Sequence, residues 1–127
     1  MENERPQSSP IPEIVLIDED TGFCNSLKFL LKEHEIELEH SDEFLDILIL
    51  LKRNTKLLMI DTSILQREGF HHLDHIRVHF PDTKIMLTAS GNRAAGNVEG
   101  IRRGAAACLL KFFPRERWLR VVQQALC

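Results

Sequence analysis

Long apolar runs are missing from this sequence of 127 residues. No stretch approaches the roughly 18 consecutive apolar residues that a membrane-spanning helix needs, and the first residues lack the basic and apolar regions of a signal peptide. Cysteine is also scarce, and Cys24, Cys108 and Cys127 show no metal-type spacing, which argues against a disulfide framework or a zinc site. We therefore expect a cytoplasmic protein with reduced thiols and no membrane partner.

Charge is nearly balanced overall but unevenly distributed along the chain, whose net charge is -3. Residues 84–127 carry eight Lys or Arg against two Asp or Glu, which is a charge of +6. Residues 1–83 carry eight basic side chains against seventeen acidic ones. A basic face attracts an acidic protein partner or nucleic acid, or is simply the solvated surface of two helices.

The first 13 residues differ from the rest in composition. They contain three prolines and two serines without a periodic apolar pattern, which is typical of a flexible leader. From Ile14 onward, short apolar runs alternate with helical patterns, as in repeated βα units around a parallel sheet. We therefore expect a leader over residues 1–13 and one α/β domain over residues 14–127. Strands are predicted near 14–17, 35–39, 56–60, 84–88 and 106–110.

Helical periodicity fills the intervals between the predicted strands. In the first helix, Leu27, Leu30 and Leu31 share one apolar stripe. A loop is predicted from the third strand to Gly69, and the next helix ends at Pro81, because proline cannot continue a helix. Further helices are predicted over 42–53, over 93–104 and from Pro114 to near the end of the chain.

The predicted helix over 42–53 is unusually apolar. Its hydrophobic side chains cover a wide arc rather than a single stripe. We expect a well-buried helix, and the alternative is a surface for a partner or for a second copy of the chain. The apolar side chains in question are Phe44, Leu45, Ile47, Leu48, Ile49 and Leu51.

Four of the apolar runs stop on a polar residue. The stops are Asp18, Asp61, Thr88 and Lys111. Because the carboxyl ends of parallel strands share one edge of a sheet, these side chains are expected to converge in one pocket. The sequence therefore predicts carboxylates, a hydroxyl and an ammonium facing one another.

This combination suits phosphoryl transfer. Three successive acidic residues, 18–20, would repel one another without a cation, and hard carboxylate oxygens suit Mg²⁺. The carboxylate of Asp61 can act as a nucleophile and form an acyl phosphate. Thr88 and Lys111 would then supply positioning and charge neutralisation, which is most of what this reaction needs.

The motifs resemble those of receiver domains of two-component response regulators. The resemblance covers Ile14 to Leu126 and is greatest with single-domain regulators of the chemotaxis type. It implies a flavodoxin-like, three-layer α/β fold with a doubly wound five-stranded parallel sheet in the order 2-1-3-4-5. The motifs are IVLIDED, LLMID, EGF with Gly69 eight residues after Asp61, PDTKIMLTAS and RRGAAACLLK.

The resemblance also implies a metal site. Mg²⁺ would be bound by the side chains of Asp18, Glu19 and Asp61 and by the backbone carbonyl of Ser63. Asp61 would accept a phosphoryl group from a histidine kinase or a histidine phosphotransfer protein. Such a domain is not an enzyme in the usual sense, because it only catalyses its own phosphorylation and the slow hydrolysis of its aspartyl phosphate.

Three further residues would contact the phosphoryl group in a receiver of this kind. Thr88 would bond to a phosphoryl oxygen, Lys111 would pair with the group, and Ala89 would leave space for it. Phosphorylation would shift the face formed by the fourth helix, fifth strand and fifth helix. That basic face would bind a downstream protein, a homodimer is allowed, and direct nucleic-acid binding is not expected.

The sequence departs from the receiver pattern around Lys111. Receivers usually have an aromatic ring three positions earlier, where this chain has Cys108, and a proline directly afterwards, where it has Phe112. These departures leave a pseudo-receiver, a binding module without phosphorylation, as one alternative. Another is a haloacid-dehalogenase-like phosphatase, because residues 18–22 (DEDTG) resemble its nucleophile turn. We expect retained chemistry and an altered output.

Overall fold

The computed structural model describes residues 12–91 and 94–127. Its five strands form one parallel sheet in the order β2-β1-β3-β4-β5, so the doubly wound fold and its strand order are confirmed. The expected leader falls almost entirely outside the described residues. The strands are β1 (Ile14–Ile17), β2 (Leu38–Ser41), β3 (Leu57–Asp61), β4 (Lys84–Ala89) and β5 (Ala107–Leu110).

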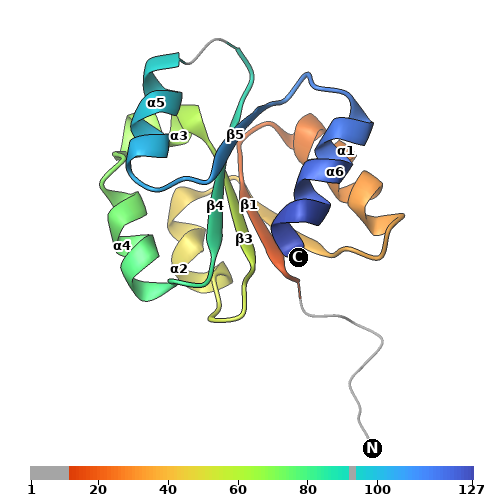
Figure 1. Cartoon of the computed structure of the whole chain (residues 1–127), viewed down its shortest axis with the longest axis horizontal. Helices are drawn as coiled ribbons and strands as arrows, with labels where there is room; N and C mark the ends of the chain where they lie inside the picture. Colours follow the sequence, from red (N-terminus) through yellow and green to blue (C-terminus); the bar gives the residue numbers. More distant parts are fainter. Residues whose placement is uncertain (1–11, 92–93) are drawn as a thin grey trace, which may run out of the picture.

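Helices cover both faces of the sheet (Figure 1). One face carries α1 (Thr21–Lys32) and α6 (Arg115–Leu126). The other face carries a 3₁₀ turn and four helices, one more helix than predicted. These are the turn (Phe44–Asp46), α2 (Ile47–Leu50), α3 (Thr62–Glu68), α4 (His72–His79) and α5 (Ala94–Arg102).

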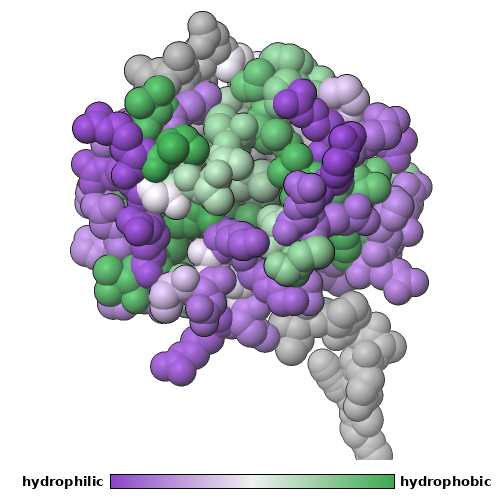
Figure 2. All heavy atoms as spheres, viewed as in Figure 1, coloured by the Kyte–Doolittle hydropathy of each residue, from purple (hydrophilic) through white to green (hydrophobic). Residues whose placement is uncertain are grey.

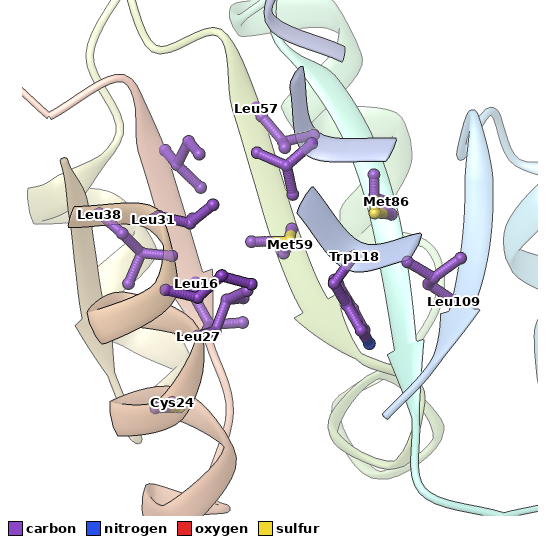
Figure 3. Packing of buried hydrophobic residues seen from close by; sticks show 13 residues of the cluster. Leu16, Cys24, Leu27, Leu31, Leu38, Leu57, Met59, Met86, Leu109 and Trp118 are labelled. Carbon is purple, nitrogen blue, oxygen red and sulfur yellow. The ribbon is translucent and has the colours of Figure 1, made fainter. Parts of the chain in front are cut away.

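Alternation along the strands divides the apolar interior into two clusters. On β1, Leu16 faces α1 and α6, whereas Val15 and Ile17 face the opposite helices. Figure 3 shows the first cluster, in which Leu27 of α1 and Trp118 of α6 lie against the sheet. Because the central strands are buried on both faces, their ends are held rigidly where the four polar stops occur.

The predicted strand over 35–39 forms two to three residues later. The end of α1 extends into a turn in which Glu35 has a φ of 61° and the N–H of Ile36 donates to Leu31 O at 3.0 Å. These residues are therefore unavailable for the sheet, and pairing with β1 begins at Leu38. In the observed strand order β2 lies at one edge of the sheet.

The length predicted for the helix over 42–53 is wrong. The Ser41 hydroxyl donates to Asp46 Oδ2 at 2.5 Å and accepts from the N–H of Glu43 at 3.0 Å, which holds the beginning of the segment in a turn. At the other end the chain turns extended at Leu51, with φ −71° and ψ 133°. Only one turn of α-helix remains between these points.

The expectation that this helix is well buried also fails. Ile47 and Leu51 are buried, but Leu45, Leu48 and Ile49 have exposed fractions of 69%, 81% and 65%. The short helix thus presents a second apolar side that is exposed in the part of the chain that the structure describes.

The loop predicted after β3 is a helix. Asp61 ends the strand and Thr62 begins α3 without an intervening turn. The sequence TSILQRE contains several good helix formers, and the helix ends where Gly69 adopts a φ of 115° and donates its N–H to Leu65 O at 2.7 Å. The last residue of β3 is thus coupled directly to a helix.

None of the helices in the described part of the chain is long and apolar enough to cross a membrane.

Candidate functional site

The four polar stops meet at the carboxyl edge of the sheet. Ile17, directly before Asp18, pairs with Ile60, directly before Asp61. Asp61 itself lies opposite Thr88 on the neighbouring strand. The register of β4 with β5 brings Lys111 to the same level, where its N–H donates to Ala89 O at 2.8 Å. The predicted convergence is therefore present in the fold.

Asp18 is the most heavily bonded residue of the group. It is fully buried, and Lys111 Nζ lies 2.8 Å from its carboxylate. The hydroxyl of Thr88 donates to Asp18 Oδ2 at 3.2 Å, and the backbone N–H of Asp20 donates to Oδ1 at 2.9 Å. Three strands are thereby tied together through one carboxylate.

Burial dominates the acid–base behaviour of Asp18. Desolvation raises its pKa above the ordinary value of an aspartate, the hydrogen bond from Lys111 opposes this, and the charge of Asp61 adds to it. The negative charge is consequently held at a cost in free energy. A positive charge entering the pocket would reduce that cost.

Asp61 is more open than Asp18. Its side chain is 12% exposed, and one oxygen accepts a hydrogen bond from the hydroxyl of Ser63. The other oxygen, Oδ1, lies 3.8 Å from Lys111 Nζ. The Asp61 side chain is therefore mostly buried but partly open to solvent, with an ammonium beside its Oδ1.

Glu19 is paired with a side chain of α3. Its carboxylate forms an ion pair with Arg67 of α3, with 2.8 Å between Oε2 and Nη2. Within residues 12–91 and 94–127, no three His, Cys, Asp or Glu side chains are grouped closely enough to hold a metal ion. The three carboxylates predicted as metal ligands are near one another in the fold but are not assembled as a cage.

The donor chemistry of these residues nevertheless fits Mg²⁺. Carboxylates of Asp18, Glu19 and Asp61 provide the hard oxygen atoms that this ion prefers, and it needs only one or two of them with water. Burial, which raises the pKa of Asp18, also leaves its carboxylate poorly solvated, so a cation beside it would be favourable. Assembly of the full set requires Glu19 to leave Arg67.

An aromatic pair lies under Lys111. The ammonium is 5.2 Å from the ring centre of Phe23, which is in turn 5.2 Å from the ring of Trp118. The indole N–H donates to Leu110 O at 3.2 Å, and Trp118 is only 3% exposed. The charged site is thus in contact with the interface between α1 and α6.

A polar junction occupies the position next to Cys108, where receivers usually have an aromatic ring. The hydroxyl of Thr62 donates to Asn97 Oδ1 of α5 at 2.9 Å and also hydrogen-bonds the Cys108 thiol, whose pKa is raised by burial. Thr62 directly follows Asp61. A Cβ added to Gly96 would lie 2.8 Å from Thr62 Cγ2, so this glycine allows α5 to approach closely.

Sequence reasoning did not identify Arg67, Thr62 or Asn97 as parts of the site. Arg67 approaches Glu19 only because residues 62–68 are helical, and the same helix turns Thr62 toward α5. The signal that could have revealed them is the helix-forming composition of this segment.

The profile of the response regulator receiver domain matches residues 14–123. The chain therefore belongs to the receiver domain family of response regulators. It is 29% identical over 111 residues to the transcriptional regulatory protein SrrA of Staphylococcus aureus strain NCTC 8325 / PS 47. That match covers 86% of this chain and 46% of SrrA, so the chain spans about half the length of this relative.

Solved receiver structures have the same fold. A response regulator from Thermotoga maritima aligns with a TM-score of 0.79 at 21% identity, over 92% of this chain and 98% of its own. The beryllofluoride-activated NtrC4 receiver domain dimer aligns with a TM-score of 0.74 at 20% identity, over 89% and 94% of the two chains. Family membership makes this a signalling domain of two-component systems rather than a classical enzyme.

Proposed function

We propose that the domain is phosphorylated on Asp61 and signals through contacts with other proteins. The observation that carries this proposal is the buried bond between Lys111 and Asp18 beside the partly exposed carboxylate of Asp61. An ammonium in this place can neutralise the charge of an incoming phosphoryl group without leaving its own pocket. The remaining departures from the receiver pattern lie outside this set of contacts.

In the proposed reaction, an Asp61 oxygen attacks the phosphorus of a phosphohistidine on a kinase or phosphotransfer protein. An O–P bond forms, the P–N bond breaks, and the histidine nitrogen keeps the electron pair. Lys111 then pairs with the phosphoryl oxygens, the Thr88 hydroxyl donates to one of them, and Ala89 provides space. Slow attack by water returns the carboxylate and releases phosphate.

Asp18, Glu19, Asp61 and the backbone carbonyl of Ser63 would hold Mg²⁺ in this proposal. The ion would supply neutralising charge to the phosphoryl oxygens. The chain's own part is to bring the carboxylates to one edge, to keep Asp18 ionised through Lys111, and to release Glu19 from Arg67.

The proposed output surface is the face of α5, β5 and α6, which correspond to the predicted fourth helix, fifth strand and fifth helix. Figure 2 shows apolar side chains gathered over α5 and β5 between two hydrophilic areas. Val98, Ile101 and Phe112 are exposed there, and Arg102, Arg115 and Arg117 supply positive charge. An apolar centre with basic surroundings favours an acidic protein partner.

Intact mass measurement tests the phosphorylation directly. The protein is incubated with Mg²⁺ and a small-molecule phosphoryl donor, and the expected result is the addition of one phosphoryl group to the wild type. Asp61→Asn should show no adduct. Asp20→Asn is the matched control, because this carboxylate lies at the same edge but is half exposed and caps α1, so its adduct should persist.

The same experiment separates the alternatives. A wild type without any adduct under conditions that phosphorylate another receiver would favour a pseudo-receiver. Continuous phosphate release that survives Asp61→Asn and disappears in Asp18→Asn would favour a phosphatase.

A further inference from the structure

Three exposed apolar side chains gather on the short helix α2 and the turn before it. Leu45, Leu48 and Ile49 follow one another at spacings of three and one, with exposed fractions of 69%, 81% and 65%. Scattered exposed apolar residues are normal in proteins, but adjacent ones of this size indicate an interaction surface. We call these three side chains the α2 patch.

A groove adjoins the α2 patch. It has a volume of about 240 Å³ and shares Ile49 with the patch. Ile49 thus belongs both to the patch and to the wall of the groove, and the exposed Leu48 directly precedes it in the chain. The groove is lined by Pro12, Val15, Glu39, Ile49, Leu50 and Lys52.

Charges flank the α2 patch with opposite signs at its two ends. Asp42 and Glu43 are exposed before it, and Lys52 is exposed after it. The ammonium of Lys52 donates to Ile49 O at 2.7 Å, so this charge is held at the carboxyl end of the helix. In sequence order the surface is acidic, apolar and then basic.

We propose that the α2 patch is an interface with a second copy of this chain. A two-fold axis near Leu48 would place the two α2 segments antiparallel, with the acidic end of each against Lys52 of the other. Leu48 of each copy would then enter the groove of its partner. A two-fold interface requires a surface that complements itself, and the sequence of acid, apolar and base about Leu48 has that property.

A second copy accounts for this pattern better than an unrelated protein. A partner of another kind would need a complementary surface of its own. Here Leu48, the groove and both kinds of charge occur on the same surface of one chain. The apolar contacts would supply the affinity, while the exposed ion pairs, which are individually weak, would fix the antiparallel orientation. The proposal is independent of phosphorylation at Asp61, which lies at the carboxyl edge of the sheet.

Sedimentation velocity over a range from micromolar to near-millimolar protein tests the proposal. The wild type and Asp61→Asn are both expected to shift from monomer to dimer with increasing concentration. Leu48→Glu should weaken the dimer by more than about tenfold, because it replaces the apolar side chain at the centre of the contact by a carboxylate that must be desolvated on entering the groove. The matched control is Phe29→Glu, at a site of 65% exposure on α1 and outside both proposed surfaces, which should leave the dimer unchanged.

A charge exchange tests the antiparallel orientation. Glu43→Lys alone should weaken the dimer severalfold by facing the partner's Lys52, and the double variant Glu43→Lys with Lys52→Glu should restore it. Unfolding midpoints of all variants show whether the fold is intact. A wild type that stays monomeric over the whole range, or a dimer broken by Phe29→Glu and not by Leu48→Glu, would overturn the inference.

Discussion

Lys111 binds Asp18 with 2.8 Å between Nζ and Oδ2, while its distance to Asp61 Oδ1 is 3.8 Å. In the unphosphorylated domain the ammonium of Lys111 therefore pairs mainly with Asp18, which is not the proposed phosphoryl acceptor. It remains within reach of the other one, so a phosphoryl group on Asp61 would compete with Asp18 for the same cation.

Replacement of Lys111 by methionine should lower stability in a pH-dependent way. Burial already raises the pKa of Asp18, and loss of the ammonium would raise it further. The folded protein would then bind more protons than the unfolded chain, so stability falls as pH rises through this interval. The expected loss is about 3 kcal/mol at pH 8 and distinctly less at pH 5.

Urea unfolding at several pH values measures this effect. Lys84→Met, which removes an exposed lysine from the opposite end of the sheet, is the control and should change stability little at any pH. An equal loss at pH 5 and pH 8 in Lys111→Met would contradict the assignment of Asp18 as the responsible group.

Arg67→Met should strengthen Mg²⁺ binding. Arg67 holds Glu19 at 2.8 Å in a half-exposed pair, and the ion must displace it to gain that carboxylate. Because such a pair is worth at most about 1 kcal/mol, the dissociation constant should fall by up to about fivefold. Amide chemical shifts of residues 18–20 during a Mg²⁺ titration provide the measurement.

Lys56→Met controls for the general effect of removing one positive charge. Lys56 pairs with Glu13 at 3.8 Å with similar exposure, but at the amino edge of the sheet. If both variants shift the dissociation constant equally, Arg67 has no specific effect on the site. If neither variant nor the wild type responds to Mg²⁺, the proposed metal ligands are wrong.

Thr62→Val should loosen α5 from the rest of the domain. It removes the 2.9 Å bond to Asn97 and leaves that amide oxygen without this donor, at a cost of about 1–2 kcal/mol. Hydrogen exchange of the α5 amides should accelerate more than exchange in α1. Thr83→Val also removes a buried threonine bond, to Thr55 O at 2.7 Å, and should destabilise the domain without singling out α5.

Gly69→Ala should destabilise the domain by about 1–3 kcal/mol. Gly69 has a φ of 115°, which side-chain-bearing residues rarely adopt, and a Cβ there would lie 2.6 Å from the His71 ring. Gly91→Ala is the matched control, since a Cβ at that position meets no atom of the described residues within 4 Å. Thermal unfolding of both variants distinguishes backbone strain from a general effect of replacing glycine.

The sheet and the four polar stops could be predicted from the sequence because each depends on a local pattern. An apolar run ending in Asp18 or Lys111 is visible within a few residues, and parallel strands then bring distant ends together. The prediction needs no knowledge of packing. This is why the strand ends agree with the structure to within one residue at the carboxyl edge, apart from the displaced edge strand β2.

The surroundings of the site could not be predicted in this way. The Glu19–Arg67 pair depends on α3, and the junction of Thr62 with Asn97 depends on how closely α5 packs. The length of α2 is decided by the Ser41 and Asp46 hydrogen bond, which competes with the helix that apolar composition favours. Each of these three features is decided by which of several competing contacts is the most stable. The periodicity of the sequence does not contain that information.

The aromatic contact of Lys111 makes the indole of Trp118 a natural fluorescence probe of the charged site. Trp118 is the only tryptophan of the chain, and a single ring, Phe23, separates it from the ammonium. Indole emission depends on the local field and on neighbouring rings, so displacement of Lys111 toward Asp61 would be registered in the emission spectrum. Rapid-mixing fluorescence can therefore follow the kinetics of phosphorylation in the unlabelled protein, because its tryptophan lies beside the charged site.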